Sequence, residues 1–297
     1  MRSLSRRLSI LMIAMSVSVA SARAVNAQVW QLWTMRVDGS GLAQIPGLAG
    51  YSCHSPKWSP NGEEIAFDFR GPGESLQASQ VAIVGVDGKK FRVLAPGGYA
   101  GWSLDGKQCV YHTYGSPQSV AVISADGRGP EVLLAGRAGP RWLADGNHIG
   151  MMGRGGLSIF DVVTGTDRAI AMIASVYPGY GFSTDGHRVV FGKYSGGLFL
   201  ATFDPQTMRA KVKTIAEGGK CYGVAWSPDD ERVVVSWRPN DPIGNREPTT
   251  DQQLYTFEPN GDLRLKLLPG QRTDRSNKNP DWSRDGTMIV FSSAERE

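Results

Sequence analysis

One short pattern occurs six times along the chain, and it constrains the fold more than any other feature. Each copy has an aromatic residue, a following Ser in most copies, then Asp-Gly or Asn-Gly in all but one, and then a run of apolar residues. Repeats with a period of about 40 residues are typical of solenoids and propellers. The aromatic anchors are spaced 44, 40, 40, 44 and 56 residues apart, and they are Trp58, Trp102, Trp142, Phe182, Trp226 and Trp282.

Each copy of the pattern encodes a β-hairpin. The Asp-Gly pair supplies the positive-φ residues of a tight turn, and a run such as Val189-Val190-Phe191 has the β-branched and aromatic residues of a returning strand. A second hairpin follows in several repeats, for example over residues 81–94 with its turn at Asp87-Gly88. Two hairpins fill one period, so the spacing predicts one four-stranded antiparallel blade per repeat.

The two chain ends predict how the blades close into a ring. A single blade leaves both of its apolar faces uncovered, so neighbouring blades must bury them. Residues 29–45 have the pattern of the second half of a blade, and residues 280–293 have that of a first half. We therefore expect an all-β, six-bladed propeller over residues 28–297, with the N-terminal strands completing the sixth blade.

Residues 1–27 have the pattern of a signal peptide. A basic start with Arg2, Arg6 and Arg7 precedes an apolar run over 8–20, which is too short to span a bilayer at about 20 residues. Small residues favour cleavage after Ala27, with Ala24 as the second site. The general secretory route is favoured over the twin-arginine route, whose motif is matched only in part. We expect a periplasmic or secreted protein with no transmembrane segment after cleavage.

The charge of the chain after cleavage excludes nucleic acid as an expected partner. The leader carries four of the 32 basic residues and no acidic one, so the rest of the chain holds 28 of each sign. Nucleic-acid binding depends on an excess of basic residues over a surface. The alkaline pI of about 9.0 belongs to the precursor.

The repeat resembles that of the TolB family. The pattern Trp-Ser-Pro-Asp-Gly-x-x-Ile-Ala-Phe, with a proline shortly before it at Pro56, Pro140 and Pro280, covers essentially all of the chain after the leader. The resemblance implies a periplasmic location and a propeller face that binds a partner, as TolB binds a peptidoglycan-associated lipoprotein. TolB proper also carries an α/β domain ahead of its propeller, and no such domain is evident here. The resemblance therefore implies a TolB-like paralogue rather than TolB itself.

Aligning the repeats assigns residues to the two faces of the ring. We name the face with the Asp-Gly turns the bottom face, and the face with the residues four and five before each anchor the top face. Aromatic and arginine side chains with few acids gather near the top face, and such residues dominate binding hot spots. We predict a monomeric, non-catalytic module without a cofactor that binds an envelope protein or lipoprotein, or a glycan. The predicted surface is Arg137, Tyr177, Tyr180, Lys220, Tyr222, Arg238, Arg246 and Arg275.

The alternative is a metal-assisted polysaccharide lyase or hydrolase. His54 and His112 are expected near the top face, whereas His148 and His187 follow turns of the bottom face. A divalent metal site would need His54 and His112 together with a third ligand such as Asp68, because zinc-type sites require three or four convergent ligands. The sequence contains no Gly-x-Ser-x-Gly or His-Glu-x-x-His motif, so no catalytic residue is predicted.

The three cysteines differ in their expected positions. Cys109 aligns with core residues of the other returning strands. Cys53 and Cys221 both lie five residues before an anchor, on blades one and five. Two buried thiols are expected there, with a disulfide across a narrow channel as the alternative.

Overall fold

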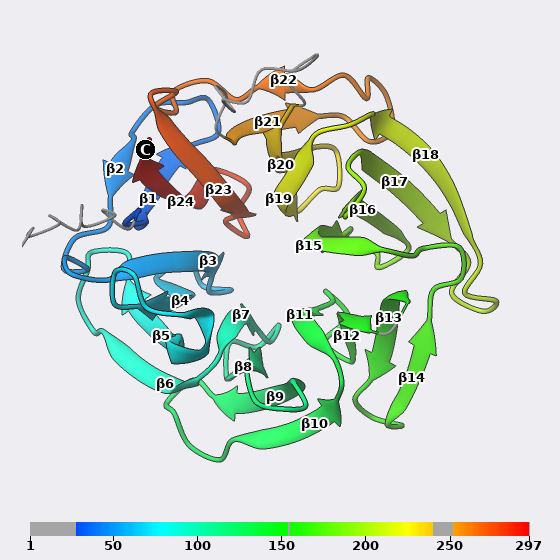
Figure 1. Cartoon of the computed structure of the whole chain (residues 1–297), viewed down its shortest axis with the longest axis horizontal. Helices are drawn as coiled ribbons and strands as arrows, with labels where there is room; N and C mark the ends of the chain where they lie inside the picture. Colours follow the sequence, from blue (N-terminus) through cyan, green and yellow to red (C-terminus); the bar gives the residue numbers. More distant parts are fainter. Residues whose placement is uncertain (1–27, 154, 240–251, 297) are drawn as a thin grey trace, which may run out of the picture.

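A computed structural model describes residues 28–153, 155–239 and 252–296. Six four-stranded antiparallel sheets surround a central axis, which confirms the six-bladed propeller (Figure 1). The predicted leader lies outside the described residues. From the axis outwards the strands are β3 (Ser52–Trp58), β4 (Glu64–Arg70), β5 (Gln80–Gly85) and β6 (Arg92–Pro96) in blade one; β7 (Gly98–Trp102), β8 (Gln108–Thr113), β9 (Ser119–Ser124) and β10 (Glu131–Ala135) in blade two; β11 (Ala138–Trp142), β12 (His148–Gly153), β13 (Gly156–Asp161) and β14 (Thr166–Ala169) in blade three; β15 (Val176–Phe182), β16 (Arg188–Lys193), β17 (Leu198–Phe203) and β18 (Ala210–Ala216) in blade four; β19 (Lys220–Trp226), β20 (Val233–Arg238), β21 (Gln253–Phe257) and β22 (Lys266–Leu267) in blade five; and β23 (Arg275–Trp282), β24 (Met288–Glu295), β1 (Gln31–Arg36) and β2 (Ala43–Gln44) in blade six.

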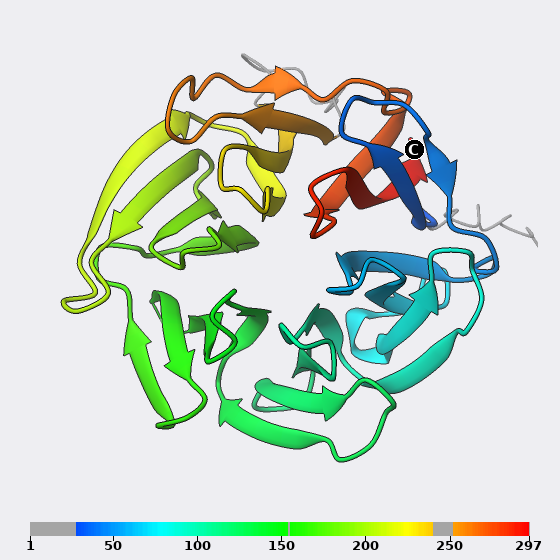
Figure 2. The same ribbon diagram turned by 180° about the vertical axis from the view of Figure 1, so that it is seen from behind.

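Blade six is built from both ends of the described chain. Strand β1 pairs antiparallel with β24, in a register that sets Gln31 opposite Ser293 and Arg36 opposite Met288. Figures 1 and 2 show the blue N-terminal strands beside the red C-terminal ones. The predicted closure is thus confirmed, and each of the six sheets has a neighbouring sheet on both sides.

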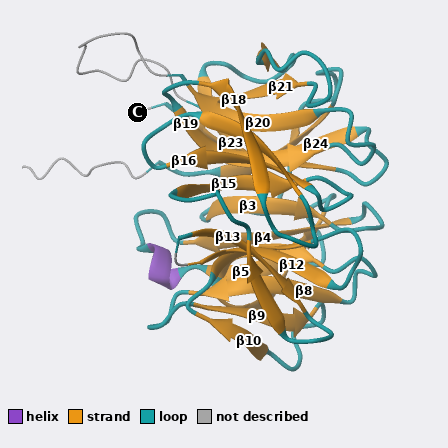
Figure 3. Ribbon diagram, turned by 90° about the vertical axis from the view of Figure 1, so that its right-hand side faces the viewer, coloured by secondary structure: helices purple, strands orange, loops and turns teal. Residues whose placement is uncertain are grey.

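The core lies between adjacent blades. One cluster joins Val81 and Ile83 of blade one to Trp102, Cys109 and Ile123 of blade two, and each of these side chains is buried. The side view in Figure 3 shows mostly strands, with the short 3-10 helix η1 (Leu76–Ala78) on the same side as the C-terminus. Within the described residues no helix is long and apolar enough to cross a membrane.

The Ser and Asp of the repeat hold the first turn of each blade. Ser103 Oγ accepts a hydrogen bond from the backbone N–H of Gln108 at 3.0 Å and donates to Asp105 at 2.7 Å. Blade three has Leu143 at the serine position, and there Asp145 accepts hydrogen bonds from the backbone N–H groups of Asn147 and His148. The serine contacts recur at Ser59, Ser183, Ser227 and Ser283. The repeated residues therefore build blades.

The anchor tryptophans of blades two and five link neighbouring blades. Trp102 Nε1 donates to the carbonyl of Lys57 in blade one at 3.1 Å, and Trp226 Nε1 donates to the carbonyl of Gly181 in blade four at 2.8 Å. Each of these two indoles thus satisfies a backbone group of the preceding blade while its rings pack in the core. The link does not recur at the other tryptophan anchors, whose Nε1 atoms are buried without a hydrogen-bond partner: Trp58, Trp142 and Trp282.

All three cysteines are free and buried, so Cys53 and Cys221 form no disulfide. Burial raises the pKa of Cys109 and of Cys221 to about 12. Because the reactive form of cysteine is the thiolate, these thiols are chemically inert at neutral pH.

Candidate functional site

The innermost strands lose their regular register partway along the channel, and we name this level of the channel the waist. Each of these six strands has a register shift shortly before its anchor. In three blades the residue three before the anchor is a non-glycine residue with positive φ: Ser55 (50°), Tyr99 (56°) and Asn279 (53°). Such conformations cost on the order of 1–3 kcal/mol each and concentrate at functional sites. The channel and its two mouths are therefore the candidate functional sites.

Near the top face, five side chains of blades four and five form what we name the tyrosine cluster: Tyr177, Tyr194, Lys220, Tyr222 and Arg238. The Tyr177 ring meets the rings of Tyr194 and Tyr222 edge to face, with centroids 5.3 and 5.7 Å away. The guanidinium of Arg238 lies over the Tyr222 ring at 5.6 Å, and the ammonium of Lys220 donates to the carbonyl of Tyr194. Mutual contact fixes these side chains before any partner arrives.

The sequence predicted four of these five residues. It missed Tyr194, which follows β16 and is 59% exposed. A signal was present, because the position twelve residues after the anchor carries an aromatic or basic side chain in several repeats. Those residues are Arg70, Tyr114, Arg154, Tyr194 and Arg238.

The other predicted surface residues lie apart from the cluster. Arg137 is paired with Asp167 within blade three, with Nε 3.0 Å from the carboxylate. Arg275 is only 8% exposed and donates to Ser293 Oγ at 3.1 Å inside blade six. Arg246 lies outside the described residues.

Tyr180 does not lie on a surface. Its side chain is fully buried, and its hydroxyl donates to the carbonyl of Gly139. The ring fills the space between the innermost strands of blades three and four, because Gly139 has no side chain there. The register shift in β15 turns Tyr180 towards its neighbour, so its assignment to the binding surface is corrected to the core.

His54 and His112 are buried on neighbouring blades and have local partners. His112 Nδ1 accepts a hydrogen bond from the backbone N–H of Gly139 at 3.2 Å, and burial lowers the pKa of His112 to about 4. His54 Nε2 lies 3.2 Å from Ser52 Oγ, and burial lowers the pKa of His54 as well. Across the described ranges, no group of three or more His, Cys, Asp or Glu side chains could hold a metal ion.

A buried charged region lies below the top face, at the seam of blades six and one. Lys278 Nζ lies 3.5 Å from the centroid of the Trp30 ring, and burial lowers the pKa of Lys278 to about 7. Asp68 is 2% exposed and accepts a hydrogen bond from the backbone of Tyr99 at 3.1 Å. Burial raises the pKa of Asp68, so the seam disfavours charge of either sign.

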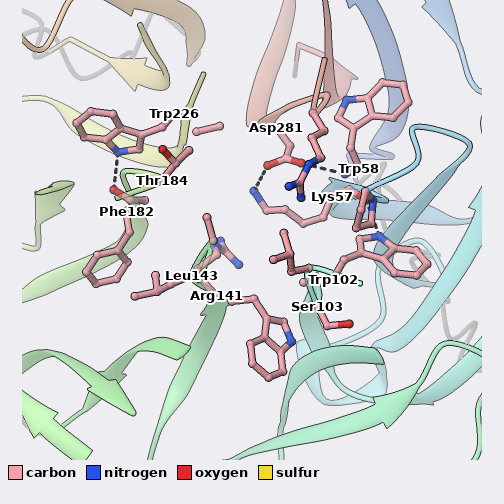
Figure 4. A pocket seen from close by; sticks show the side chains of 18 of the residues that line it. Lys57, Trp58, Trp102, Ser103, Arg141, Leu143, Phe182, Thr184, Trp226 and Asp281 are labelled. Atoms are coloured by element: carbon pink, nitrogen blue, oxygen red, sulfur yellow. Dashed lines mark hydrogen bonds and ion pairs between the residues drawn. The ribbon is translucent and has the colours of Figure 1, made fainter. Parts of the chain in front are cut away.

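The bottom mouth of the channel contains a pocket of about 260 Å³ (Figure 4). On one side, Lys57 Nζ pairs with Asp281 Oδ1 at 2.6 Å, and Asp281 Oδ2 accepts the backbone N–H of Trp58 at 2.9 Å. Figure 4 shows Arg141 entering the pocket across from this pair. Arg141 donates a hydrogen bond to the neighbouring carbonyl of Pro140, at 3.2 Å.

Sequence reasoning missed this pocket. The residue immediately before each anchor carries the signal, and in blade six it is the acid Asp281. The same position carries Lys57 and Arg141, and these long charged side chains alternate with small residues in the other blades. The small residues are Gly101, Gly181 and Ala225.

Several solved structures have a fold similar to this one. No family model and no curated protein matches the sequence. Among solved structures, one described as TolB from Agrobacterium tumefaciens is similar with a TM-score of 0.67 at 16% identity, over 91% of this chain and 99% of that one. TolB from Acinetobacter baumannii is similar with a TM-score of 0.55 at 14% identity, over 90% of this chain and 65% of that one. Hydrazine synthase from Kuenenia stuttgartiensis has a TM-score of 0.61 at 14% identity, over 82% and 72%.

These similarities define a class of fold. The chain is a six-bladed β-propeller like that of TolB, with four-stranded blades and a last blade closed by the N-terminal strands. At 14–16% identity the likeness concerns the fold alone. Function has to be argued from the sites at the two mouths.

Proposed function

We propose that the protein is an exported, non-catalytic binding module that takes another protein of the cell envelope at its top face. The tyrosine cluster is the observation that carries this proposal. Tyrosine and arginine give large contact areas at low cost in conformational entropy, and they predominate in binding hot spots. The likeness to TolB propellers and the predicted signal peptide support a partner in the periplasm or outside the cell.

The chemistry of the cluster fits association better than catalysis. Its five residues include no carboxylate, histidine or thiol, and the ammonium of Lys220 is engaged by the carbonyl of Tyr194. The two histidines considered as metal ligands are buried, and although His112 Nε2 has no hydrogen-bond partner, no group of three ligands forms among the described residues. Nothing in the described part of the chain favours the lyase or hydrolase alternative.

The test is a crosslinking pull-down from the native cell envelope with the wild type and two double variants. Tyr194→Ala with Arg238→Ala removes the exposed part of the cluster and should reduce the recovered partner at least about tenfold, as expected for hot-spot residues. The control pairs Val132→Ala with Arg128→Ala on blade two. Val132 is 62% exposed, close to the 59% of Tyr194, and Arg128 forms an ion pair with the neighbouring Asp126.

The control variant should recover the partner like the wild type. Circular dichroism and thermal unfolding establish that both variants are folded. Full recovery by a folded Tyr194→Ala, Arg238→Ala protein would contradict the proposal.

A further inference from the structure

We propose that the pocket at the bottom mouth is a binding site for a carboxylate group carried on an apolar body. Four charged side chains line it: the cations Lys57, Arg141 and Arg284, and the single acid Asp281. The two carboxylate oxygens of Asp281 already face Lys57 Nζ and the N–H of Trp58. The pocket therefore holds an excess of positive charge that Asp281 does not neutralise.

Arg141 is the partly buried cation of the pocket that lacks a counter-ion among the described residues. Its Nε is buried without a hydrogen-bond partner, and none of the ion pairs between described residues involves its guanidinium. The guanidinium also lies 5.9 Å from the centroid of the Tyr180 ring, but this contact does not neutralise its charge. A partly buried charge without a counter-ion is unfavourable, and binding a counter-ion stabilises it. The positive charge of Arg141 also acts on two neighbouring cationic groups, because it contributes to lowering the pKa of both Lys57 and His112.

The shape of the pocket leaves room for a counter-ion beside Arg141. The small residues Gly101, Gly181 and Ala225 occupy the ring position that Lys57, Arg141 and Asp281 occupy in the other blades. The pocket of about 260 Å³ extends past these small residues, and a Cβ atom added at Gly101 would make only an ordinary van der Waals contact, with Val110 Cγ1 at 3.7 Å. The space faces the bottom mouth, so a ligand can enter without moving a blade.

The apolar side chains around the charged groups favour a ligand with an apolar body. Trp58, Trp102, Trp142, Phe182, Leu143 and Leu104 line the pocket around the charged groups. Ligand sites of this kind combine an apolar lining with a few placed polar groups that fix orientation. An aromatic or aliphatic body against these walls would place its carboxylate at Arg141, with the exposed Arg284 at the rim.

The polar groups favour a carboxylate over a phosphate. The planar fork of one arginine matches the two oxygens of a carboxylate. Asp281 in the same ring repels a doubly charged group more strongly than a singly charged one. The carboxylate can come from a small organic acid or from the C-terminus of a peptide, and the two sources present the same group to Arg141.

Isothermal titration calorimetry with four probes tests the site. N-acetyl-tryptophan and N-acetyl-leucine carry the carboxylate, and the corresponding amides have the same bodies without the charge. We expect both acids to bind saturably and both amides to bind at least about tenfold more weakly, because a charge-assisted hydrogen-bond pair is lost. Absence of saturable binding by either acid, or equal binding of acids and amides, would overturn the proposal.

Variants assign the binding to the pocket. Arg141→Gln should weaken binding of the acids at least about tenfold, and Arg284→Gln, on the exposed rim, should weaken it less. Lys213→Gln, on the outer strand β18, is the matched control and should leave binding unchanged. If Arg141→Gln does not fold, the Arg284→Gln protein decides, and wild-type affinity in that variant would overturn the proposal.

A peptide arm distinguishes the two sources of the carboxylate. An acetylated tetrapeptide that ends in tryptophan with a free C-terminus should bind more tightly than N-acetyl-tryptophan if the natural ligand is a peptide end. Equal or weaker binding of the peptide identifies a small acid as the better ligand. Each result supports the carboxylate site, while the Tyr194→Ala, Arg238→Ala protein should bind all probes normally, so the two proposals fail independently.

Discussion

At the scale of the residue, the exceptions to the repeat are the informative positions. Blade five has Asp230 where the other turns have glycine, and Asp230 adopts a φ of 57°. Its carboxylate accepts hydrogen bonds from the backbone N–H of Thr184 at 2.9 Å and from Thr184 Oγ1 at 2.8 Å, and it lies 3.3 Å from Arg188. The strained backbone at this turn is offset by contacts that bridge blades four and five.

Asp230→Gly should therefore destabilise the protein although it relieves the strained backbone. The glycine gains up to about 1 kcal/mol from its conformational freedom and loses hydrogen bonds to a charged group worth about 1.5–3 kcal/mol. We expect a net loss of about 1–2 kcal/mol in the free energy of unfolding, measured by urea denaturation. A more stable Asp230→Gly protein would show that the bridging contacts contribute little.

The half-buried Lys278 makes stability depend on pH. Its folded-state pKa of about 7 lies below the value of 10.5 for a free lysine. Between these values the unfolded chain binds a proton that the folded protein does not, so the free energy of unfolding rises with pH. The slope is at most about 1.4 kcal/mol per pH unit.

Lys278→Met removes this titration and keeps the apolar stem beside Trp30. Relative to the wild type, the variant should be stabilised most below pH 7 and progressively less as the pH rises towards 10. Urea denaturation at intervals from pH 6 to pH 10 measures the difference. Parallel curves for the two proteins would mean that Lys278 keeps an ordinary pKa.

At the scale of the element, the sequence predicted the blades better than it predicted the side chains in the channel. Six copies of a turn with a returning strand define the hairpins, and the half-blades at the two ends define the closure. The register shifts in the innermost strands have no comparably clear sequence signal, because they depend on how neighbouring blades approach one another. For that reason Tyr180 was expected on a surface and lies in the core, and the pocket around Arg141 was missed.

The approach of the blades at the waist makes a specific prediction about glycines. A Cβ atom at Gly179 would lie 2.4 Å from the carbonyl oxygen of Cys221, whereas one at Gly101 would lie 3.7 Å from its nearest neighbour. Gly179→Ala should cost at least about 2 kcal/mol, because backbone of blade five would have to move. Gly101→Ala is the matched control and should change stability by less than about 0.5 kcal/mol. Similar unfolding midpoints for the two variants would contradict the close packing at the waist.

At the scale of the whole molecule, a closed ring presents two mouths with different chemistry. The top face gathers tyrosines and two cations into a preformed cluster, and the bottom mouth encloses an arginine without a carboxylate partner among the described residues. Both sites are assembled from more than one blade, so their geometry depends on closure by β1 and β24. A rigid ring of this kind suits recognition, because little order has to be created on binding.

Site-specific photo-crosslinking in growing cells tests the proposed top-face interaction most directly. The photo-reactive residue p-benzoylphenylalanine replaces Tyr194 in one strain and the equally exposed Val132 in another. The account predicts an adduct with a discrete envelope protein from position 194 and none from position 132. No adduct at position 194, or the same adducts from both positions, would contradict it.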